Sequence, residues 1–367
     1  MTLDILTTPL QTRIHEAIRQ AGGWLGFERF MEMALYTPGL GYYANDLRKF
    51  GLMPGGATDA GSDFVTAPEM SPRFGQALAR QIAEAFDATG VTEVWEFGAG
   101  SGALAEQILQ ALPQITRYTI VDLSGSLRAR QQQRLSSFDT KLSWATALPD
   151  KMRGVVIGNE VLDAMPVKLL GRVNNIWHEH GVVLHEGALA YADQLTDLRP
   201  PFEVVGEHDY VTETHSQAEG FVRTLADKLE AGAIFMIDYG FPEHEYYHQQ
   251  RSMGTVMCHR AHQVDADALA DVGYKDITAH VNFTGIALAG QEGGLQVLGY
   301  TGQGRFLLNC GVLFGMEDAS IADRVMVQKL INEHEMGELF KVIAFGAKNT
   351  AAWQPMGFAT GDRTHTL

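Results

Sequence analysis

The residues from Val94 to Leu104 constrain the fold of this chain most strongly. They read VWEFGAGSGAL, an apolar strand that turns into a helix through three alternate glycines. Glycine adopts positive φ without steric cost and lets a ligand lie against bare backbone. The helix behind the turn offers unpaired N–H groups in its first turn. The segment therefore predicts a nucleotide-type cofactor site at the end of a buried strand.

Strands and helices alternate along the chain on both sides of this loop. We expect strands at 91–97, 117–122, 155–159, 233–238, 295–300 and 339–345. We expect helices at 9–21, 25–35, 73–88, 103–111, 125–135, 214–229 and 321–331. Such alternation predicts an α/β fold in which helices cover both faces of a mostly parallel, doubly wound sheet.

Two stretches interrupt this alternation. Residues 168–195 alternate apolar and polar side chains, which predicts an inserted β-hairpin or meander. Its turn signals are Asn174-Asn175, His180-Gly181 and Glu186-Gly187. Residues 241–294 form a second insertion of mixed character. We expect both to follow the carboxyl ends of strands, where open α/β sheets bind ligands.

A third irregular stretch, residues 37–72, is rich in Gly, Pro and Tyr and is too long for a plain connector. Loops of this length are usually functional or disordered, and its aromatic residues favour an ordered loop. At its end, we expect Ser71 to cap the next helix and Pro72 to occupy the first helical position.

Two acidic residues narrow the choice of cofactor. The glycines follow the pattern GxGxG, whereas a dinucleotide fold would show GxGxxG. Glu96, two residues before the first glycine, would repel a pyrophosphate but attract the ammonium and sulfonium of S-adenosylmethionine. Asp122 ends the next strand, where a carboxylate accepts ribose hydroxyls. These features favour S-adenosylmethionine over NAD, and the alternative is a tight turn with a capping acid.

A second polar motif, GNEVLDAMP, begins at Gly158, directly after an apolar strand. Asn159 and Glu160 lie where residues that orient a nitrogen nucleophile would be. Asp163 follows three residues later, so on a first helical turn it would face the same way as Glu160. Two carboxylates in one pocket suit a guanidinium, which offers five donors in a planar fork. The alternative is that both acids stabilise a helix N-terminus.

Charge and cysteine content exclude several classes of protein. The 28 Lys and Arg residues against 44 Asp and Glu residues give a net charge of −16, which disfavours binding to nucleic acid or to an anionic membrane surface. The two cysteines form no CxxC motif, so the sequence supports neither a disulfide framework nor a cysteine-based zinc site. Residues 1–10 lack the features of a leader, and no apolar run reaches the ~20 residues of a membrane span. We expect a cytoplasmic protein without membrane insertion.

Histidines near other ligand-type residues raise the question of a metal site. Neither His178, His180 and His185 nor Cys258, His259 and His262 have a familiar zinc spacing, so we expect no metal. His262 and His280 remain open as substrate-side bases or as structural residues. Tyr239 would either wall off the reacting centre or simply pack.

The chain resembles the MidA-like methyltransferases, a family that contains a mitochondrial complex I assembly factor and many bacterial relatives. The motifs that carry the resemblance occur in the right order and cover nearly the whole chain. They are LYTPGLGYY (35–43), DFVTAPE (63–69) with FG (74–75), EFGAGSG (96–102), GNE with DAMP (158–160 and 163–166), IDYG (237–240), DITAHVNF (276–283) and QGRF (303–306).

The resemblance implies a class I methyltransferase (Rossmann-like) fold whose mostly parallel sheet has an antiparallel last strand. It implies a helical extension and pocket-covering loop at 1–90, then a methyltransferase domain at 91–367 with insertions at about 168–212 and 241–294. The implied cofactor residues are Glu96, Gly98, Ala99, Gly100, Gly102, Asp122, Leu123, Thr66, Pro68 and Glu69. Ala99 stands where the family often has Pro, and Asn282 where Asp is common.

The resemblance further implies that the chain methylates arginine on a protein client, with Asn159, Glu160 and Asp163 as the catalytic residues. A client-binding assembly factor and a methyltransferase for another substrate class remain alternatives. The client, the general base, mono- or symmetric dimethylation, mobility of the 37–72 loop and the oligomeric state, a homodimer included, stay open.

Overall fold

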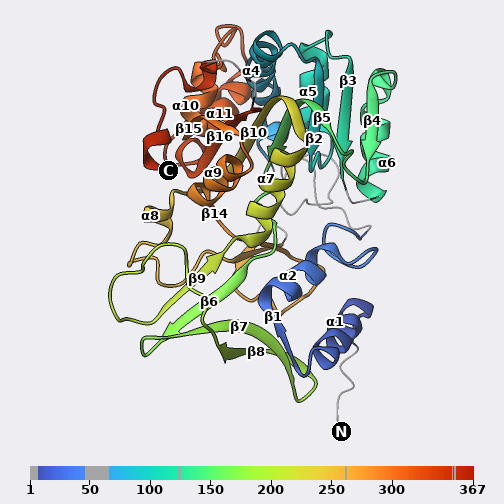
Figure 1. The fold of residues 1–367 in the computed structure, drawn as a ribbon. Coiled ribbons are helices and arrows are strands. Elements are labelled where there is room, and N and C mark those ends of the chain that lie inside the picture. Colours follow the sequence, from blue (N-terminus) through green and yellow to red (C-terminus); the bar gives the residue numbers. More distant parts are fainter. Residues whose placement is uncertain (1–6, 46–65, 123–124, 261–262, 349, 351–352) are drawn as a thin grey trace. The chain divides into compact units, whose positions relative to one another are not determined.

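One eight-stranded sheet carries the glycine loop and the GNEVLDAMP motif (Figure 1). Its strand order is β15-β16-β10-β5-β2-β3-β4, and the short β14 pairs with β10. The five strands from β10 to β4 run parallel, whereas β16 is antiparallel to both β10 and β15. The predicted mostly parallel sheet with an antiparallel last strand is confirmed. The strands are β2 (Glu93–Phe97), β3 (Arg117–Val121), β4 (Leu142–Ala145), β5 (Met152–Asn159), β10 (Leu229–Phe241), β14 (Val281–Asn282), β15 (Gln296–Gly302) and β16 (Phe340–Gly346).

The computed structural model describes residues 7–45, 66–122, 125–260, 263–348, 350 and 353–367. They fall into two units, each built from three stretches of chain. Unit 1 comprises Met1–Arg48, Ala164–Ala218 and Glu243–His280, and unit 2 comprises Lys49–Asp163, Glu219–Pro242 and Val281–Leu367. The eight-stranded sheet belongs to unit 2.

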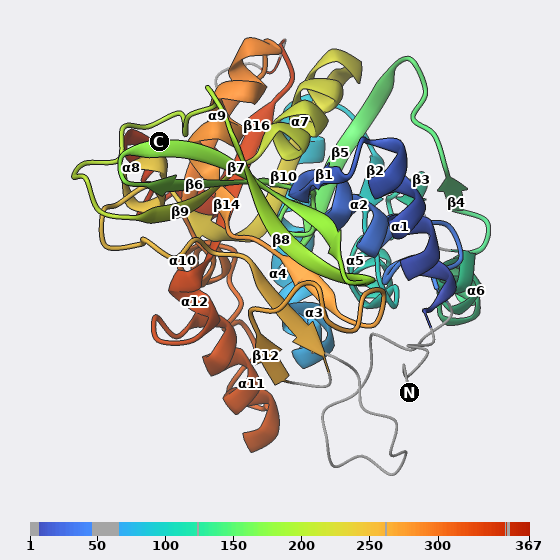
Figure 2. The ribbon, with the colours of Figure 1, turned by 90° about the horizontal axis from the view of Figure 1, so that it is seen from below.

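Helices cover both faces of the unit 2 sheet (Figures 1 and 2). On one face, α4, α5, α10 and α11 share a core with the strands, built from residues such as Phe74, Ile108, Phe235 and Phe306. On the other face, α9 contacts β10, β15 and β16, and Phe221 of α7 packs against Phe97. The helices of this unit are α3 (Ala67–Met70), α4 (Pro72–Thr89), α5 (Ala103–Ala111), α6 (Gly125–Arg134), α7 (Ser216–Lys228), α9 (Phe283–Glu292), α10 (Gln303–Asn309), α11 (Ile321–Ile331) and α12 (Met336–Leu339).

Two glycines let β10 and β5 approach closely. Gly232 lies opposite Gly154 in the pairing of these strands. Gly232 has a φ of 127°, and a Cβ atom there would lie 1.9 Å from the carbonyl oxygen of Gly154. Only glycine tolerates both the conformation and the contact.

Unit 1 is built on a five-stranded antiparallel sheet, in which β7 pairs with β1, β6 and β8, and β6 pairs with β9. Its core joins residues of α1 and α2 to sheet residues such as Val182. The elements are α1 (Pro9–Gln20), β1 (Trp24–Gly26), α2 (Phe27–Tyr36), β6 (Lys168–Val173), β7 (Ile176–His185), β8 (Ala188–Leu195), β9 (Tyr210–Thr214), α8 (Glu243–Tyr246), β11 (Met257–Arg260), β12 (Gln263–Asp265) and β13 (Asp276–Thr278).

The predicted meander is present as β6, β7 and β8. Its turns at Asn174-Asn175 and Glu186-Gly187 are confirmed, since all four residues have positive φ. The turn predicted at His180-Gly181 is wrong, because both residues lie inside β7 and pair with β8. The helix predicted at 25–35 begins later, because Trp24–Gly26 pairs with β7 as a strand.

The start of α4 follows the sequence prediction. Pro72 opens the helix, and the Oγ of Ser71 accepts a hydrogen bond from the backbone N–H of Arg73 at 3.3 Å. The preceding loop is only partly described, because residues 46–65 lie outside the described residues.

Candidate active site

The glycine loop leaves β2 and leads into α5 with three residues in the left-handed region. Gly98, Gly100 and Gly102 have φ values of 63°, 53° and 82°. Gly102 precedes the first residue of α5, and the N–H of Gly98 donates to the carbonyl of Val121 at 3.2 Å. The loop therefore presents bare backbone at a helix N-terminus, as its sequence predicts.

Glu96 is the last residue but one of β2, just before this loop, and is almost wholly buried, with 2% of its surface exposed. The hydroxyl of Tyr118, on the neighbouring β3, donates to its Oε2 at 2.7 Å. Burial, opposed by the Tyr118 hydrogen bond and assisted by the charge of Asp122, raises the pKa of Glu96 to about 8. A buried carboxyl of this kind stabilises a cation that enters the same site.

Asp122 follows β3 beside the glycine loop. The Nε2 of Gln131, on α6, donates to Asp122 Oδ2 at 2.9 Å and to the carbonyl of Gly100 at 3.0 Å. The two predicted cofactor elements, acid and loop, are thus held by one side chain. Leu123, also predicted here, lies outside the described residues.

The segment before α4 also reaches the glycine loop. Glu69 of α3 accepts a hydrogen bond from Ser101 of the loop and pairs with Arg134 of α6 at 3.3 Å. The carbonyl of Pro68 accepts from the Nε2 of Gln107, on α5, at 2.7 Å. Thr66 precedes α3 without a side-chain capping bond. Glu69 is thereby placed at the loop with its charge balanced by a cation.

The acidic motif begins where β5 ends. Glu160 has a φ of 56°, a conformation that costs a non-glycine residue ~1–2 kcal/mol. Its backbone N–H donates to the carbonyl of Ile237, on β10, at 2.9 Å. Its carboxylate accepts from the Nδ2 of Asn159 at 2.9 Å and from the backbone N–H of Ala67. The strained backbone turns this carboxylate back towards Asn159 and α3.

Asp238, near the end of β10, binds the backbone that follows Glu160 in the motif. Its Oδ2 accepts from the backbone N–H groups of Val161, Leu162 and Asp163 at 3.0, 2.8 and 3.3 Å. Residues 161–167 form a turn and loop rather than the predicted helical turn. The interpretation of both acids as helix N-terminal residues is therefore wrong.

Asp163 nevertheless joins Glu160, as predicted. It is 5% exposed, and its Oδ2 accepts from the hydroxyl of Tyr239 at 2.6 Å. Burial, and next the charge of Asp163, raise the pKa of Glu160 to about 8. Burial and both other carboxylates also raise the pKa of Asp238. The three acids form one buried cluster that we call the acidic loop (Glu160, Asp163 and Asp238). Besides burial, the charges of its other carboxylates raise the pKa values of Glu160 and Asp238.

Comparisons with known proteins identify the protein family in which this site occurs. Residues 77–301 match the family described as "Putative S-adenosyl-L-methionine-dependent methyltransferase". A crystal structure from Burkholderia thailandensis, of a protein bound to S-adenosyl-homocysteine, is 46% identical and superimposes with a TM-score of 0.92 over 98% of this chain and 96% of the other. A second, native structure from that organism is 45% identical with a TM-score of 0.87 and the same coverage.

The chain belongs to this family of methyltransferases. Among curated proteins, it is 27% identical to the mitochondrial protein arginine methyltransferase NDUFAF7 of Danio rerio, over 90% of this chain and 85% of that protein. The human protein of that name is 24% identical over 92% and 83%. The predicted fold and family are confirmed.

S-adenosylmethionine is the cofactor of this methyltransferase, and the residues of the glycine loop fit it. Buried Glu96 suits its cationic amino acid portion, Asp122 suits a ribose diol, and the positive-φ glycines leave room for the ligand against the backbone. The roles of the individual residues stay predictions.

The other candidate residues divide between the two units. His280 lies in unit 1, where its carbonyl is 2.8 Å from His215 Nε2, whereas the acidic loop belongs to unit 2. His262 lies outside the described residues. In the part of the chain that is described, no group of three His, Cys, Asp or Glu side chains is placed to hold a metal ion. Within the same residues, every helix is too short or too polar to cross a bilayer.

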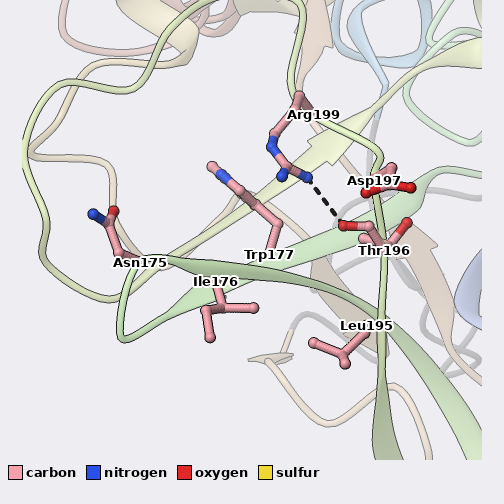
Figure 3. Close-up of a pocket in the computed structure, with 7 residues that line it drawn as sticks. All are labelled: Asn175, Ile176, Trp177, Leu195, Thr196, Asp197 and Arg199. Carbon is pink, nitrogen blue, oxygen red and sulfur yellow. Dashed lines mark hydrogen bonds between the residues drawn. The ribbon is translucent and has the colours of Figure 1, made fainter.

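A pocket of about 410 Å³ lies in unit 1 (Figure 3). None of the predicted site residues is among the residues that line it. In Figure 3, the Arg199 guanidinium folds onto the Thr196 backbone and donates to its carbonyl at 3.0 Å. The lining residues are Asn175, Ile176, Trp177, Leu195, Thr196, Asp197 and Arg199.

Sequence reasoning missed the residues that support the site from neighbouring elements. Gln131 had a detectable signal, because it lies four residues from each of the buried residues Leu127 and Leu135, on the apolar stripe of α6. Tyr118 and Arg134 carried no such signal, since only the folded sheet and helices bring them to Glu96 and Glu69.

Proposed function

We propose that this methyltransferase methylates arginine on a protein client. The observation that carries the proposal is the acidic loop, where Glu160, Asp163 and Asp238 are buried together, and where burial and then the charges of neighbouring carboxylates raise the pKa values of Glu160 and Asp238. A guanidinium would relieve this repulsion, because it is a planar cation that hydrogen-bonds carboxylates in a fork. Curated relatives named protein arginine methyltransferases support the same substrate class.

The residues of the acidic loop and its neighbour Asn159 would have different roles in binding the guanidinium and in accepting its proton. Glu160 and Asp163 bind and orient the guanidinium, and Asn159 holds the Glu160 carboxylate through its Nδ2. Bound S-adenosylmethionine supplies an electrophilic methyl group on a sulfonium. As the N–CH3 bond forms and the S–CH3 bond breaks, S-adenosyl-homocysteine would leave as the neutral thioether, and Glu160 would accept the proton that the nitrogen loses. In the free site the pKa of Glu160 is about 8, and a bound guanidinium favours the ionised form that accepts the proton.

The test compares methylation with cofactor binding. The purified chain and the variants Glu160→Gln and Asp163→Asn are incubated with isotope-labelled S-adenosylmethionine and protein lysate, and products are located by mass spectrometry. We expect methylarginine from the native chain and a loss of about 100-fold or more in both variants. Both variants should retain S-adenosyl-homocysteine binding. Label on another residue type, or on small molecules only, would contradict the proposal.

A further inference from the structure

Gln131 is a wholly buried amide with three hydrogen bonds inside unit 2. Its Nε2 donates to the Gly100 carbonyl at 3.0 Å and to Asp122 Oδ2 at 2.9 Å, and its Oε1 accepts from the Trp144 Nε1 at 3.0 Å. The side chain thus joins α6 to the glycine loop, to the end of β3 and to β4.

The chemistry of its partners fixes which way this amide points. An indole N–H only donates, so the atom facing Trp144 must be the oxygen. A backbone carbonyl and a carboxylate only accept, so the atom facing Gly100 and Asp122 must be the nitrogen. A flipped amide would lose all three bonds, and the orientation is therefore determined from both ends.

Packing alone does not account for a glutamine here. Leu127 and Leu135, one turn away on either side, are 5% and 0% exposed, so a leucine would continue the apolar stripe. Burying an amide is unfavourable unless its polar atoms are bonded. Here both amide hydrogens go to groups of the cofactor site, which indicates a role in that site.

We propose that Gln131 is a positioning residue for the cofactor. It fixes the rotation of the Asp122 carboxylate and the orientation of the Gly100 peptide group before S-adenosylmethionine binds. Because its donor is neutral, it orients Asp122 without neutralising the charge that accepts the ribose hydroxyls. Through Asp122, Gln131 acts on recognition of the ribose rather than on methyl transfer.

The first experiment measures the affinity of the full chain for S-adenosyl-homocysteine by calorimetry. Loss of a hydrogen bond to a charged group predicts that Gln131→Leu binds about 10- to 100-fold more weakly. The matched control is Gln133→Leu, an exposed position on the same helix, which should bind as the native chain does. Gln133→Leu should also methylate as the native chain does, whereas Gln131→Leu should show a raised KM for S-adenosylmethionine.

Two further measurements separate positioning from a structural role. In an Asp122→Asn background, or with a 2′,3′-dideoxyribose analogue of S-adenosyl-homocysteine, Gln131→Leu should cost little additional affinity. If Gln131→Leu lost as much affinity in these cases as it does in the native background with S-adenosyl-homocysteine, the proposal would be overturned. Gln131→Glu keeps the shape but places a second carboxyl against Asp122. Its deficit relative to the native chain should shrink as the pH falls and the new carboxyl becomes a donor, and a pH-independent deficit would also contradict the proposal.

Discussion

Burial favours the neutral form of two carboxyl groups in this protein until a cation binds beside them. Glu96 and Glu160 are both buried, and the pKa of each is raised to about 8. A protein that binds a sulfonium and an ammonium, and under the proposed function a guanidinium, needs negative charge, but permanent charge in a buried pocket is unfavourable. A raised pKa resolves this conflict, because the charge forms mainly when the ligand is present.

The raised pKa of Glu96 predicts that cofactor binding releases a proton near pH 7. The ammonium of the ligand favours the ionised carboxylate, so affinity for S-adenosyl-homocysteine should rise as the pH rises towards 8. Glu96→Gln should abolish both effects, whereas Glu93→Gln, on the same strand but in a surface pair with Arg117, should not. Calorimetry in buffers of different ionisation enthalpy measures the proton, and unchanged native affinity between pH 6 and 8 would refute the prediction.

The same shift predicts the sign of a stability change in the cofactor-free protein. The folded pKa of Glu96 lies above its ordinary value of 4.5, so the stabilisation this group provides is full below pH 4.5 and is lost as the pH rises to about 8. Urea unfolding at pH 5 and pH 8 should show Glu96→Gln gaining stability relative to the native chain at the higher pH. A relative gain at pH 5 instead would reverse the assigned sign.

Tyr239 offers a test of the acidic loop that leaves its packing intact. Tyr239→Phe removes the hydroxyl that donates to Asp163 but keeps the ring against Phe340, at 5.3 Å between centroids. Loss of a hydrogen bond to a charged group predicts a fall of about tenfold or more in kcat/KM for an arginine substrate. Cofactor affinity should stay native, whereas Tm should fall because the buried Asp163 Oδ2 loses this donor. A matching fall in cofactor affinity would show that Tyr239 serves the other ligand.

At the scale of elements, the site rests on the carboxyl ends of neighbouring parallel strands. β2 delivers Glu96 and the glycine loop, β3 delivers Asp122, β5 delivers Asn159 and Glu160, and β10 delivers Asp238 and Tyr239. Placement of these ends depends on how closely the strands pair. The closest approach involves Gly232 and Gly154, between β10 and β5.

Gly232→Ala should therefore destabilise unit 2 severely. The new Cβ would lie 1.9 Å from the Gly154 carbonyl oxygen at a φ of 127°, which predicts a loss of about 3 kcal/mol or more. Gly220→Ala is the control, because Gly220 lies within α7 with open space around it and should gain about 0.5–1 kcal/mol. Chemical denaturation measures both, and equal stability of the two variants would disprove the strain.

Elements with a strong local pattern were predictable from the sequence, and elements set by distant partners were not. Ala103–Ala111 and Ile321–Ile331 match the predicted helices, because their apolar spacing is local. Trp24–Gly26 becomes a strand only by pairing with β7, about 155 residues later. The turn after Glu160 likewise depends on Asp238, 75 residues beyond Asp163. The identities of the acids were predictable, but their backbone geometry was not.

At the scale of the whole molecule, the predicted cofactor residues that are described all belong to one of the two units. Glu96, Asp122 and the glycines lie in unit 2, as do Thr66, Pro68 and Glu69. Unit 1 interrupts unit 2 twice, at residues 164–218 and 243–280. Ligand binding stabilises what it contacts, so the two units should respond differently to the cofactor.

Hydrogen exchange with and without S-adenosyl-homocysteine tests this expectation. At a ligand concentration of 100 times the Kd, the stabilisation is about 2.7 kcal/mol, or about 100-fold in exchange rate for amides that open with the site. We expect this protection in β2, α5 and α6 of unit 2, and little change in α1 and β8 of unit 1. Equal protection in both units would show that the ligand couples them.

The left-handed backbone of Glu160 has a consequence for reading related sequences. At that position the backbone conformation favours glycine or asparagine, and the role proposed for Glu160 would account for a glutamate held at a φ of 56°. Chains that keep the fold but have lost methyl transfer are thus free to relax this residue. Under the proposed function, we therefore expect position 160 to separate active enzymes from inactive descendants in a genome survey.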